Sequence, residues 1–270
     1  MKIIRQKKDL FKTIDKKYSI SLIPTMGGLH KGHESLIYKA KKKNKKILVT
    51  IFINPKQFNS KKDFEKYPRN LAKDIKILRK NKIDYLYCPK FKDIFSFKTY
   101  NKIYMHPFSR QLCGKYRPGH FKGVLNVVNR FLEIFNPRYL FLGEKDFQQL
   151  ILIKEHIKKR KIKTTVISCK TVRSQKYLPY SSRNFNLKSS EKNLAIKAFK
   201  LIRNEKKLIK KYKNKDVFQS NIKNKLKNIG IKKIDYIKVL NDKKFSNSLK
   251  NNLRIFSAFY INKIRLIDNF

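Results

Sequence analysis

The chain has 270 residues, 41% of them hydrophobic, which is enough for one domain with a sizeable core and a smaller second domain. Its 68 Lys and Arg residues against 18 Asp and Glu give a formal net charge of +50. Residues 1–17 are too charged for a signal peptide, and no later segment has the length and hydrophobicity of a membrane span, so we expect a cytoplasmic protein with no membrane anchor.

Up to about residue 170, short β-branched or aromatic runs alternate with longer segments of helical periodicity. We expect strands at residues 19–23, 47–53, 84–88, 138–142 and 164–170, each apolar enough to be buried on both faces of a sheet. Between them, apolar residues three or four positions apart predict amphipathic helices, as at Leu71, Ile75 and Leu78. This alternation predicts an α/β fold with a parallel sheet.

The pattern changes after about residue 176. Two charged helical segments are expected at residues 190–212 and 216–228, followed by strand-like runs at 235–240 and 253–261. This grouping predicts a smaller α+β domain. We therefore expect two domains, residues 1–175 and residues 176–270.

The first candidate site is the segment PTMGGLHKGH, residues 24–33, between the first of these strands and the next helix. In an open α/β sheet this junction lies at the ligand crevice, where free N–H groups and the helix dipole favour phosphate. His30 and His33 can place two imidazoles on one side of a turn, where they donate hydrogen bonds to a phosphate. The alternative is a turn with incidental histidines. HxGH in this position resembles the signature of the adenylyl-transferring nucleotidyltransferases.

Two neutral amides, Asn54 and Gln57, follow the next strand in the sequence FINPKQF. They suit a small hydroxy acid, because amides donate to oxygens and accept from hydroxyls without adding charge. A polar turn at the end of the strand explains them equally well. On the helix after YPRN, Asp74 is one of the few acids, and solvation is its simplest role.

Three later segments combine hydrogen-bond donors with residues that interrupt or end helices and strands. RPGHFKG, residues 117–123, precedes a helix expected at 124–135 and is a loop that could close over an anion. GEKDFQQ, residues 143–149, opens a helix at the end of a strand. In this position Lys145 would contact phosphate and Asp146 would contact the ribose hydroxyls. Gln149 would point towards the same crevice as Gln57. YSSRN, residues 180–184, offers two hydroxyls and Arg183 to a triphosphate.

The positive charge, with a pI near 10.3, would attract nucleic acid without sequence preference. The excess is spread along the chain and is mostly Lys, which is typical of compositional drift, whereas a dedicated nucleic-acid-binding protein concentrates its basic residues. A protein whose charge is its function remains the alternative, and it predicts DNA binding that survives physiological ionic strength. Cys88, Cys113 and Cys169 show no CxxC spacing, so we expect buried thiols.

Six motifs in order resemble those of the pantothenate synthetase family: PTMGGLHKGH, FINPKQF, YPRNLAKD, RPGHFKGV, FLGEKDFQQL and SSRN. The likeness runs from Ile3 to the closing RLIDN. It implies a Rossmann-like nucleotidyltransferase domain, a C-terminal lid domain, a homodimer, and ligation of pantoate to β-alanine with Mg-ATP through a pantoyl adenylate. Another HxGH nucleotidyltransferase acting on a small acid is the alternative, against which Gln57, Gln149 and RPGHF argue.

The same resemblance implies roles for individual residues. His33 is the proton donor, and His30 and Lys145 act with it on the phosphates. Gln57, Gln149 and Asn54 bind pantoate, Gln57 also contacts β-alanine, and Asp74 supports Mg²⁺. The implied ATP contacts are Met26, Gly27, Gly28, Leu29, His30, Lys31, Gly32, His33, Gly143, Glu144, Lys145, Asp146, Val172, Tyr180, Ser181, Ser182 and Arg183.

The chain departs from the family pattern in three places. Residues 173–180 read RSQKYLPY and lack the acid and the glycine that usually precede SSRN. Lys31 stands where an acidic or small residue is common, and Lys73 precedes Asp74 where an acid is frequent.

Overall fold

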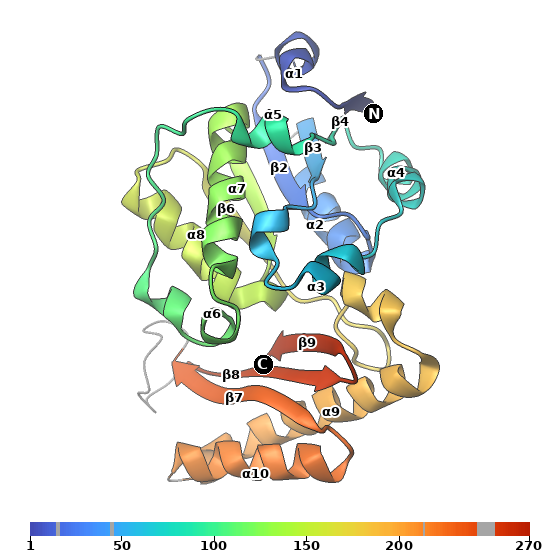
Figure 1. The fold of residues 1–270 in the computed structure, drawn as a ribbon, viewed down its shortest axis with the longest axis vertical. Helices are drawn as coiled ribbons and strands as arrows, with labels where there is room; N and C mark the ends of the chain where they lie inside the picture. Colours follow the sequence, from blue (N-terminus) through green and yellow to red (C-terminus); the bar gives the residue numbers. More distant parts are fainter. Residues whose placement is uncertain (15–16, 44–45, 213, 242–251) are drawn as a thin grey trace. The chain divides into compact units, whose positions relative to one another are not determined.

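The computed structural model describes residues 1–14, 17–43, 46–212, 214–241 and 252–270, and the chain forms two compact units (Figure 1). Unit 1 comprises Met1–Ser109 and Arg117–Thr171, and unit 2 comprises Arg110–Tyr116 and Val172–Phe270. The main division thus falls after Thr171, a few residues before the position expected from the sequence. In addition, the short segment Arg110–Tyr116 belongs to unit 2 although unit 1 flanks it on both sides.

Unit 1 is built on a six-stranded sheet in which all paired neighbours are parallel, with the order β1-β4-β3-β2-β5-β6. This confirms the predicted α/β fold with its parallel sheet. Five strands lie where the sequence predicts them, whereas β1, three residues long, is too short to show a pattern. The strands are β1 (Lys2–Ile4), β2 (Ile20–Thr25), β3 (Lys46–Ile51), β4 (Tyr85–Tyr87), β5 (Tyr139–Gly143) and β6 (Thr165–Cys169).

Helices cover both faces of this sheet. On one face, α2 (Lys31–Lys41) and α4 (Leu71–Lys80) bury apolar side chains against Val49 and Leu86 of the strands. Because strand side chains alternate between faces, Tyr87 points to the other face, where its ring packs edge-on against Phe135 of α7 (His120–Phe135) at 5.5 Å. α8 (Phe147–Lys159) packs beside α7. The shorter helices are α1 (Lys7–Thr13), α3 (Lys61–Glu65), α5 (Phe91–Phe95), η1 (Pro55–Gln57), η2 (Pro107–Arg110) and η3 (Glu144–Asp146).

The strand order places the candidate motifs at one edge of the sheet. β2 lies between β3 and β5, so the direction in which the chain builds the sheet reverses at β2. In open α/β sheets, ligands bind outside the carboxyl ends of the strands at such a reversal. The segments that follow β2, β3 and β5 contain His30, Gln57 and Lys145, respectively.

Unit 2 contains a three-stranded antiparallel sheet, β7 (Lys233–Asn241), β8 (Leu253–Ile261) and β9 (Ile264–Asn269). Two helices, α9 (Ser189–Leu208) and α10 (Lys215–Asn228), pack on it through Phe199 and Phe218, which are buried with Phe259. The predicted α+β unit is confirmed. Its shorter elements are α6 (Cys113–Tyr116), η4 (Ser182–Asn186) and η5 (Ile209–Lys211). Among the described residues of both units, no helix is long and apolar enough to cross a membrane.

Candidate functional site

The segment between β2 and α2 brings the two predicted histidines together. Gly27 and Gly28 have φ values of +77° and +61°, in the left-handed region that favours glycine. They turn the chain so that His30 caps α2 and His33 lies in its first turn. The two imidazole centroids are 4.1 Å apart. The sequence HxGH therefore gathers two rings at the N-terminus of a helix, where backbone N–H groups favour an anion.

Backbone amides determine which nitrogen of each histidine carries the proton. The Gly32 N–H donates to His30 Nδ1 at 3.1 Å, and the His30 N–H donates to His33 Nδ1 at 3.3 Å. A ring nitrogen that accepts a hydrogen bond has no proton, so in the neutral imidazole the proton is on Nε2. Each ring therefore carries its N–H on Nε2.

Burial keeps both histidines uncharged at neutral pH. Burial, His33 and Lys145 together lower the pKa of His30 to about 2. Burial also lowers the pKa of His33 to about 4, although Asp146 opposes the shift and Lys145 adds to it. Both rings are therefore neutral hydrogen-bond donors, and the ammonium of Lys145 supplies positive charge near them.

Asp74, on the first turn of α4, supports the loop that carries the histidines. Its Oδ2 accepts the Gly28 N–H at 2.9 Å, and its Oδ1 accepts the Leu29 N–H at 2.8 Å. The residue is only 3% exposed, and burial raises the pKa of its carboxyl despite the two amide donors. A Cβ on Gly27 would lie 2.9 Å from Oδ2, so the loop approaches Asp74 closely. The predicted role in solvation is wrong, because Asp74 is an internal support.

The described acids of unit 1 do not form a metal site of their own. Both oxygens of Asp74 accept backbone amides, and Asp146 Oδ1 lies 3.7 Å from Lys145 Nζ. Within the described part of the chain, no three His, Cys, Asp or Glu side chains are arranged to hold a metal ion. The residues that the structure describes therefore offer no cage of protein ligands for Mg²⁺.

Asn54 and Gln57, at the end of β3, form a buried group with Met26. Asn54 donates from Nδ2 to the Gly123 carbonyl at 3.0 Å and to Gln57 Oε1 at 3.5 Å, and its Oδ1 accepts the Lys56 N–H at 3.1 Å. Gln57 Nε2 contacts Met26 Sδ. The structure thus joins the end of β3 to the loop after β2, and Asn54 fixes the position of Gln57.

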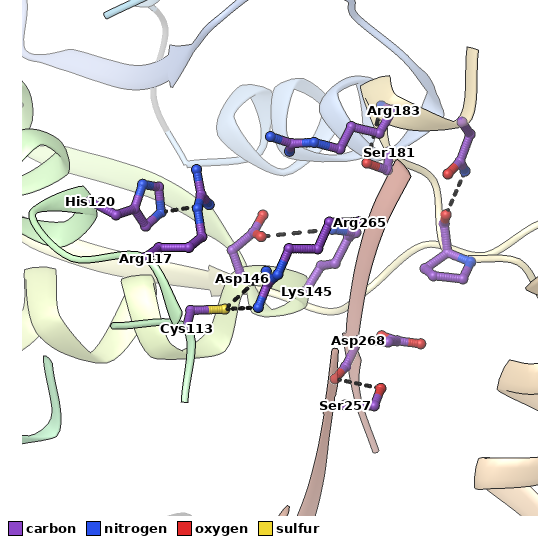
Figure 2. Close-up of polar contacts among 12 residues, drawn as sticks. Cys113, Arg117, His120, Lys145, Asp146, Ser181, Arg183, Ser257, Arg265 and Asp268 are labelled. Atoms are coloured by element: carbon purple, nitrogen blue, oxygen red, sulfur yellow. Dashed lines mark hydrogen bonds and ion pairs between the residues drawn. The ribbon is translucent and has the colours of Figure 1, made fainter. Parts of the chain in front are cut away.

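Arg117 and His120 hold the backbone of Gln57. His120 Nδ1 donates to the Gln57 carbonyl at 2.7 Å, and Arg117 Nη2 donates to the same oxygen at 3.2 Å. Figure 2 shows the two side chains pointing toward each other, with Arg117 Nη1 3.1 Å from His120 Nε2. A Cβ on Gly123 would lie 2.3 Å from the Lys56 carbonyl oxygen, so only glycine permits this approach of α7 to η1. That RPGHFKG could close over an anion stays a prediction, and its contacts in the structure position Gln57.

The segment after β5 supplies the charged groups. Lys145 and Asp146 lie in η3 and point toward each other (Figure 2), with 3.7 Å between Nζ and Oδ1. Of the two adjacent glutamines in the first turn of α8, Gln148 is buried and donates to the Phe108 carbonyl at 2.7 Å. Gln149 is only partly buried, so Gln148 stabilises the fold and Gln149 is the one accessible to a ligand.

A cavity of about 420 Å³ adjoins the loop after β2. Met26, Gly27 and Asp74 line it, together with residues from the ends of β3 and β4. Neither histidine, Lys145 nor Gln57 is part of its lining. The cavity is therefore beside the candidate reacting groups.

The remaining predicted ATP contacts lie in unit 2, where they form a turn of their own. The Val172 carbonyl accepts the Tyr180 N–H at 3.1 Å. Ser181 Oγ accepts the Arg183 N–H at 3.3 Å at the start of η4 (Figure 2). Ser182 is buried and Arg183 is partly exposed. The Ser181 hydroxyl thus shapes the turn that carries the guanidinium of Arg183.

Tyr177 has a backbone conformation that favours glycine. Its φ is +75°, and it lies in the segment that lacks the glycine usual in the family. The guanidinium carbons of Arg173 and Arg203 are 4.5 Å and 4.2 Å from its ring centroid. These contacts offset the strain of a left-handed conformation at a residue with a side chain.

Comparison with protein families and known proteins gives consistent matches. The family model described as pantoate-beta-alanine ligase matches residues 1–270. A pantothenate synthetase of Francisella tularensis subsp. novicida is 41% identical over 270 residues, 99% of this chain and 95% of that protein. A crystal structure of pantoate-beta-alanine ligase from Francisella tularensis, complexed with beta-gamma ATP and beta-alanine, is 40% identical with a TM-score of 0.85 and covers 100% of this chain and 97% of that one. A crystal structure of pantothenate synthetase from Thermus thermophilus is 26% identical with a TM-score of 0.92, over 100% and 99% of the two chains.

Proposed function

The chain belongs to the pantoate–β-alanine ligase family, and from this premise we propose that the loops after β2, β3 and β5 carry out an ATP-dependent ligation in two steps. In the first step, the carboxylate of pantoate attacks the α-phosphorus of ATP and displaces pyrophosphate. In the second, the amine of β-alanine attacks the acyl carbon and displaces AMP. The observation that carries this assignment is the pair of neutral histidines at the sheet reversal, each with its proton on Nε2.

The first step needs positioning and charge stabilisation and no general base, because the carboxylate of pantoate is already ionised at neutral pH. His30 and His33 donate from Nε2 to phosphate oxygens, which become more negative as pyrophosphate leaves. Lys145 adds a positive charge to the same group. Donors placed in this way are each worth on the order of 3 kcal/mol in the transition state. His33 and Lys145 are thus the principal catalytic residues and His30 their companion.

ATP would lie along the N-terminus of α2 and the segment after β5. The turn from Met26 to His33 would lie along the phosphates, where the dipole of α2 favours negative charge, and residues 143–146 would contact the nucleoside. From unit 2, Val172 and the turn of residues 180–183 would complete the ATP site, with Arg183 on the phosphates. In this role unit 2 would act as a lid that keeps water out of the site. Such a lid is needed because the pantoyl adenylate is a mixed anhydride, which water hydrolyses.

Pantoate would bind between the amides of Gln57 and Gln149, which match its hydroxyls and carboxylate without adding charge. Support comes from the contacts that fix Gln57 at both ends: Asn54 and Met26 on its side chain, and His120 and Arg117 on its carbonyl. β-Alanine would approach the acyl carbon next to Gln57. Asn54 then acts on pantoate through Gln57, since its own amide binds protein groups.

Mg²⁺ would enter this site with ATP and not through a cage of side chains. Mg²⁺ bound to nucleotides keeps several waters and takes its other ligands from phosphate oxygens and one or two carboxylates. Asp74 already accepts two backbone amides, and Asp146 pairs with Lys145. We therefore assign Asp74 to the support of the loop.

Three further properties follow from the family and the composition. We propose a homodimer, which light scattering coupled to size-exclusion chromatography tests through the mass in solution. We also propose a cytoplasmic location, where ATP is supplied. Nucleic acid would bind only non-specifically, through the net charge of +50.

The decisive experiment follows oxygen from pantoate. Wild-type protein is incubated with ATP, Mg²⁺, β-alanine and pantoate labelled with ¹⁸O in its carboxylate, and the products are analysed by mass spectrometry. Attack of the carboxylate on the α-phosphorus puts one ¹⁸O into AMP and leaves one in pantothenate. His33→Ala should abolish both products, whereas His106→Ala, a histidine outside the HxGH segment, should not. Unlabelled AMP, or no pantothenate, would contradict the proposal.

A further inference from the structure

The segment Arg110–Tyr116, which belongs to unit 2, is held there by a buried polar cluster. Cys113, at the start of α6, is 5% exposed, and its Sγ lies 3.0 Å from the Tyr236 hydroxyl of β7. Arg265 of β9 donates from Nη1 and Nη2 to the same sulfur at 3.6 Å and 3.7 Å (Figure 2). The ring of Tyr116 packs against that of Tyr236 at 5.7 Å. Two strands of the sheet therefore bind α6.

Arg265 is itself fixed in place. Its Nε donates to Asp235 Oδ2 at 2.7 Å, and the side chains of the two residues are 13% and 6% exposed. The Nε–H of the guanidinium thus binds a carboxylate, and its two Nη groups bind the thiol. A planar guanidinium can make these contacts simultaneously, whereas a lysine ammonium cannot.

The backbone of the segment indicates that it is constrained. Leu112 is 6% exposed and has a φ of +44°, a left-handed value that is rare for a bulky side chain. Such a conformation costs about 1–3 kcal/mol and persists only where the surrounding packing fixes it. The packing around Leu112 therefore holds the backbone of the segment in a definite geometry.

The residue that follows α6 is Arg117, which with His120 holds the carbonyl of Gln57. Consecutive Cα atoms are about 3.8 Å apart across a trans peptide, so the position of Tyr116 limits that of Arg117 closely. We propose that Arg265 is a positioning residue for Gln57, acting through Cys113 and α6 on Arg117 and His120. This inference rests on the proposed role of Gln57 in binding pantoate.

Thiol chemistry is a poor alternative for the cluster. Cys113 is buried, and it is the only cysteine in the sequence of unit 2, since Cys88 and Cys169 belong to unit 1. None of the three cysteines, all of which the structure describes, forms a disulfide. The sulfur is thus best understood as a small acceptor that fits between a hydroxyl and a guanidinium.

The test compares three variants in steady-state kinetics and hydrogen exchange. Arg265→Lys keeps the positive charge but loses the planar guanidinium that binds Asp235 and Cys113 together. Cys113→Ala removes only the sulfur that accepts from Arg265. Arg254→Lys is the matched control, because Arg254 lies at the start of β8 in the same sheet and donates to Asn269 Oδ1 at 2.7 Å. We expect the KM for pantoate to rise about tenfold in the first two variants, the effect of roughly one hydrogen bond. The KM for ATP should stay within about twofold of the control.

Hydrogen exchange gives a readout that does not depend on activity. Amides of residues 117–123 should exchange faster in Arg265→Lys and Cys113→Ala than in wild type, and not in Arg254→Lys. If Arg265→Lys fails to fold, Cys113→Ala decides. An unchanged KM for pantoate, equal rises for both substrates, or unchanged exchange at residues 117–123 would overturn the inference. A wild-type protein that forms no pantothenate but shows this exchange pattern would instead contradict the proposed function.

Discussion

Asp74 Oδ1 accepts a hydrogen bond from the Leu29 N–H at 2.8 Å, across 45 positions of sequence. The other oxygen accepts the Gly28 N–H. Asp74→Asn replaces one of these two acceptor oxygens with an NH2 donor, so one of the two backbone N–H groups loses its acceptor. We expect the free energy of unfolding of unit 1 to fall by about 1–3 kcal/mol, the usual effect of an unsatisfied buried group, and kcat to fall because the histidine loop loses its support. Urea unfolding and steady-state kinetics measure both.

The control for this substitution is Asp63→Asn on α3, which makes the same chemical change at a partly exposed acid. It should leave stability within about 0.5 kcal/mol of wild type, as for most surface changes. Equal effects of the two substitutions would contradict a structural role for Asp74.

The assignment of the histidine protons predicts an order of activity for two substitutions at His33. The amide nitrogen of glutamine can reach the place of Nε2, whereas that of asparagine reaches only the place of Nδ1. We expect His33→Asn to lower kcat by about 10²–10³-fold, and His33→Gln to lower it by less. Single-turnover measurement of AMP formation compares them. A more active asparagine variant would show that Nδ1, and not Nε2, meets the phosphate.

The two site histidines should not titrate in the physiological range. Their pKa values are lowered from 6.5 to about 2 for His30 and about 4 for His33, chiefly by burial. Both rings are therefore neutral from pH 8 down to about pH 5. The ¹⁵N chemical shifts of their imidazoles, assigned with the help of His33→Asn, should stay constant over this interval. A titration near pH 6.5 at either residue would contradict the neutral-donor mechanism.

Local sequence determines the parts of the site that could be predicted. A strand end, two glycines and the start of a helix are contiguous in residues 24–33, so the positions of His30 and His33 follow from nearest neighbours in the chain. The same holds for Lys145 after β5. These motifs needed only the rule that parallel strands end at one edge of the sheet.

Contacts between distant segments determine the parts that the sequence did not reveal. In the sequence, a buried acid on a helix cannot be told from a solvent-exposed one. Asp74 is recognised as buried only through its contact with Gly28, which is distant in the chain. The donors of RPGHFKG were apparent from the sequence, but their acceptor, the Gln57 carbonyl, lies 60 and 63 positions away from Arg117 and His120. Likewise, nothing in the sequence of α6 indicates that it packs on β7 and β9, which lie far along the chain in the same unit.

His156 should make unit 1 sensitive to acid. It is fully buried, its Nδ1 accepts the Tyr104 N–H at 3.2 Å, and its Nε2 lies 3.0 Å from Asn129 Oδ1. Burial, with Arg160, lowers its pKa from 6.5 to about 4. The unfolded chain therefore binds a proton at higher pH than the folded one, and the stabilisation present above pH 6.5 is lost as the pH falls toward 4.

We expect the free energy of unfolding to decrease between pH 6.5 and 4, and to decrease less steeply in His156→Gln, which cannot become charged. Urea unfolding at several pH values gives both slopes. Identical slopes would show that other groups, and not His156, cause the acid sensitivity.

The left-handed conformation of Tyr177 predicts that glycine is preferred to alanine at this position. Both substitutions remove the ring, so their difference isolates the backbone. With φ at +75°, Tyr177→Gly should be about 1 kcal/mol more stable than Tyr177→Ala. At Tyr38, an exposed position within α2, the order should be reversed by about the same amount because glycine is a poor helix former. Urea unfolding of the four variants tests both signs, and the same order at both positions would refute the argument.

The net charge of +50 predicts DNA binding at low salt that contributes nothing to catalysis. Each phosphate neutralised releases counterions, so affinity falls with a slope of about −0.9 per contact in a plot of log K against log salt. For about 6–10 contacts, a rise from 50 to 200 mM salt weakens binding by roughly 10³–10⁵-fold. Two duplexes of unrelated sequence, titrated by fluorescence anisotropy, should give the same slope, and nuclease treatment should leave the rate of pantothenate formation unchanged. Retention of one duplex over the other at physiological ionic strength would instead show that the charge serves a specific nucleic-acid partner.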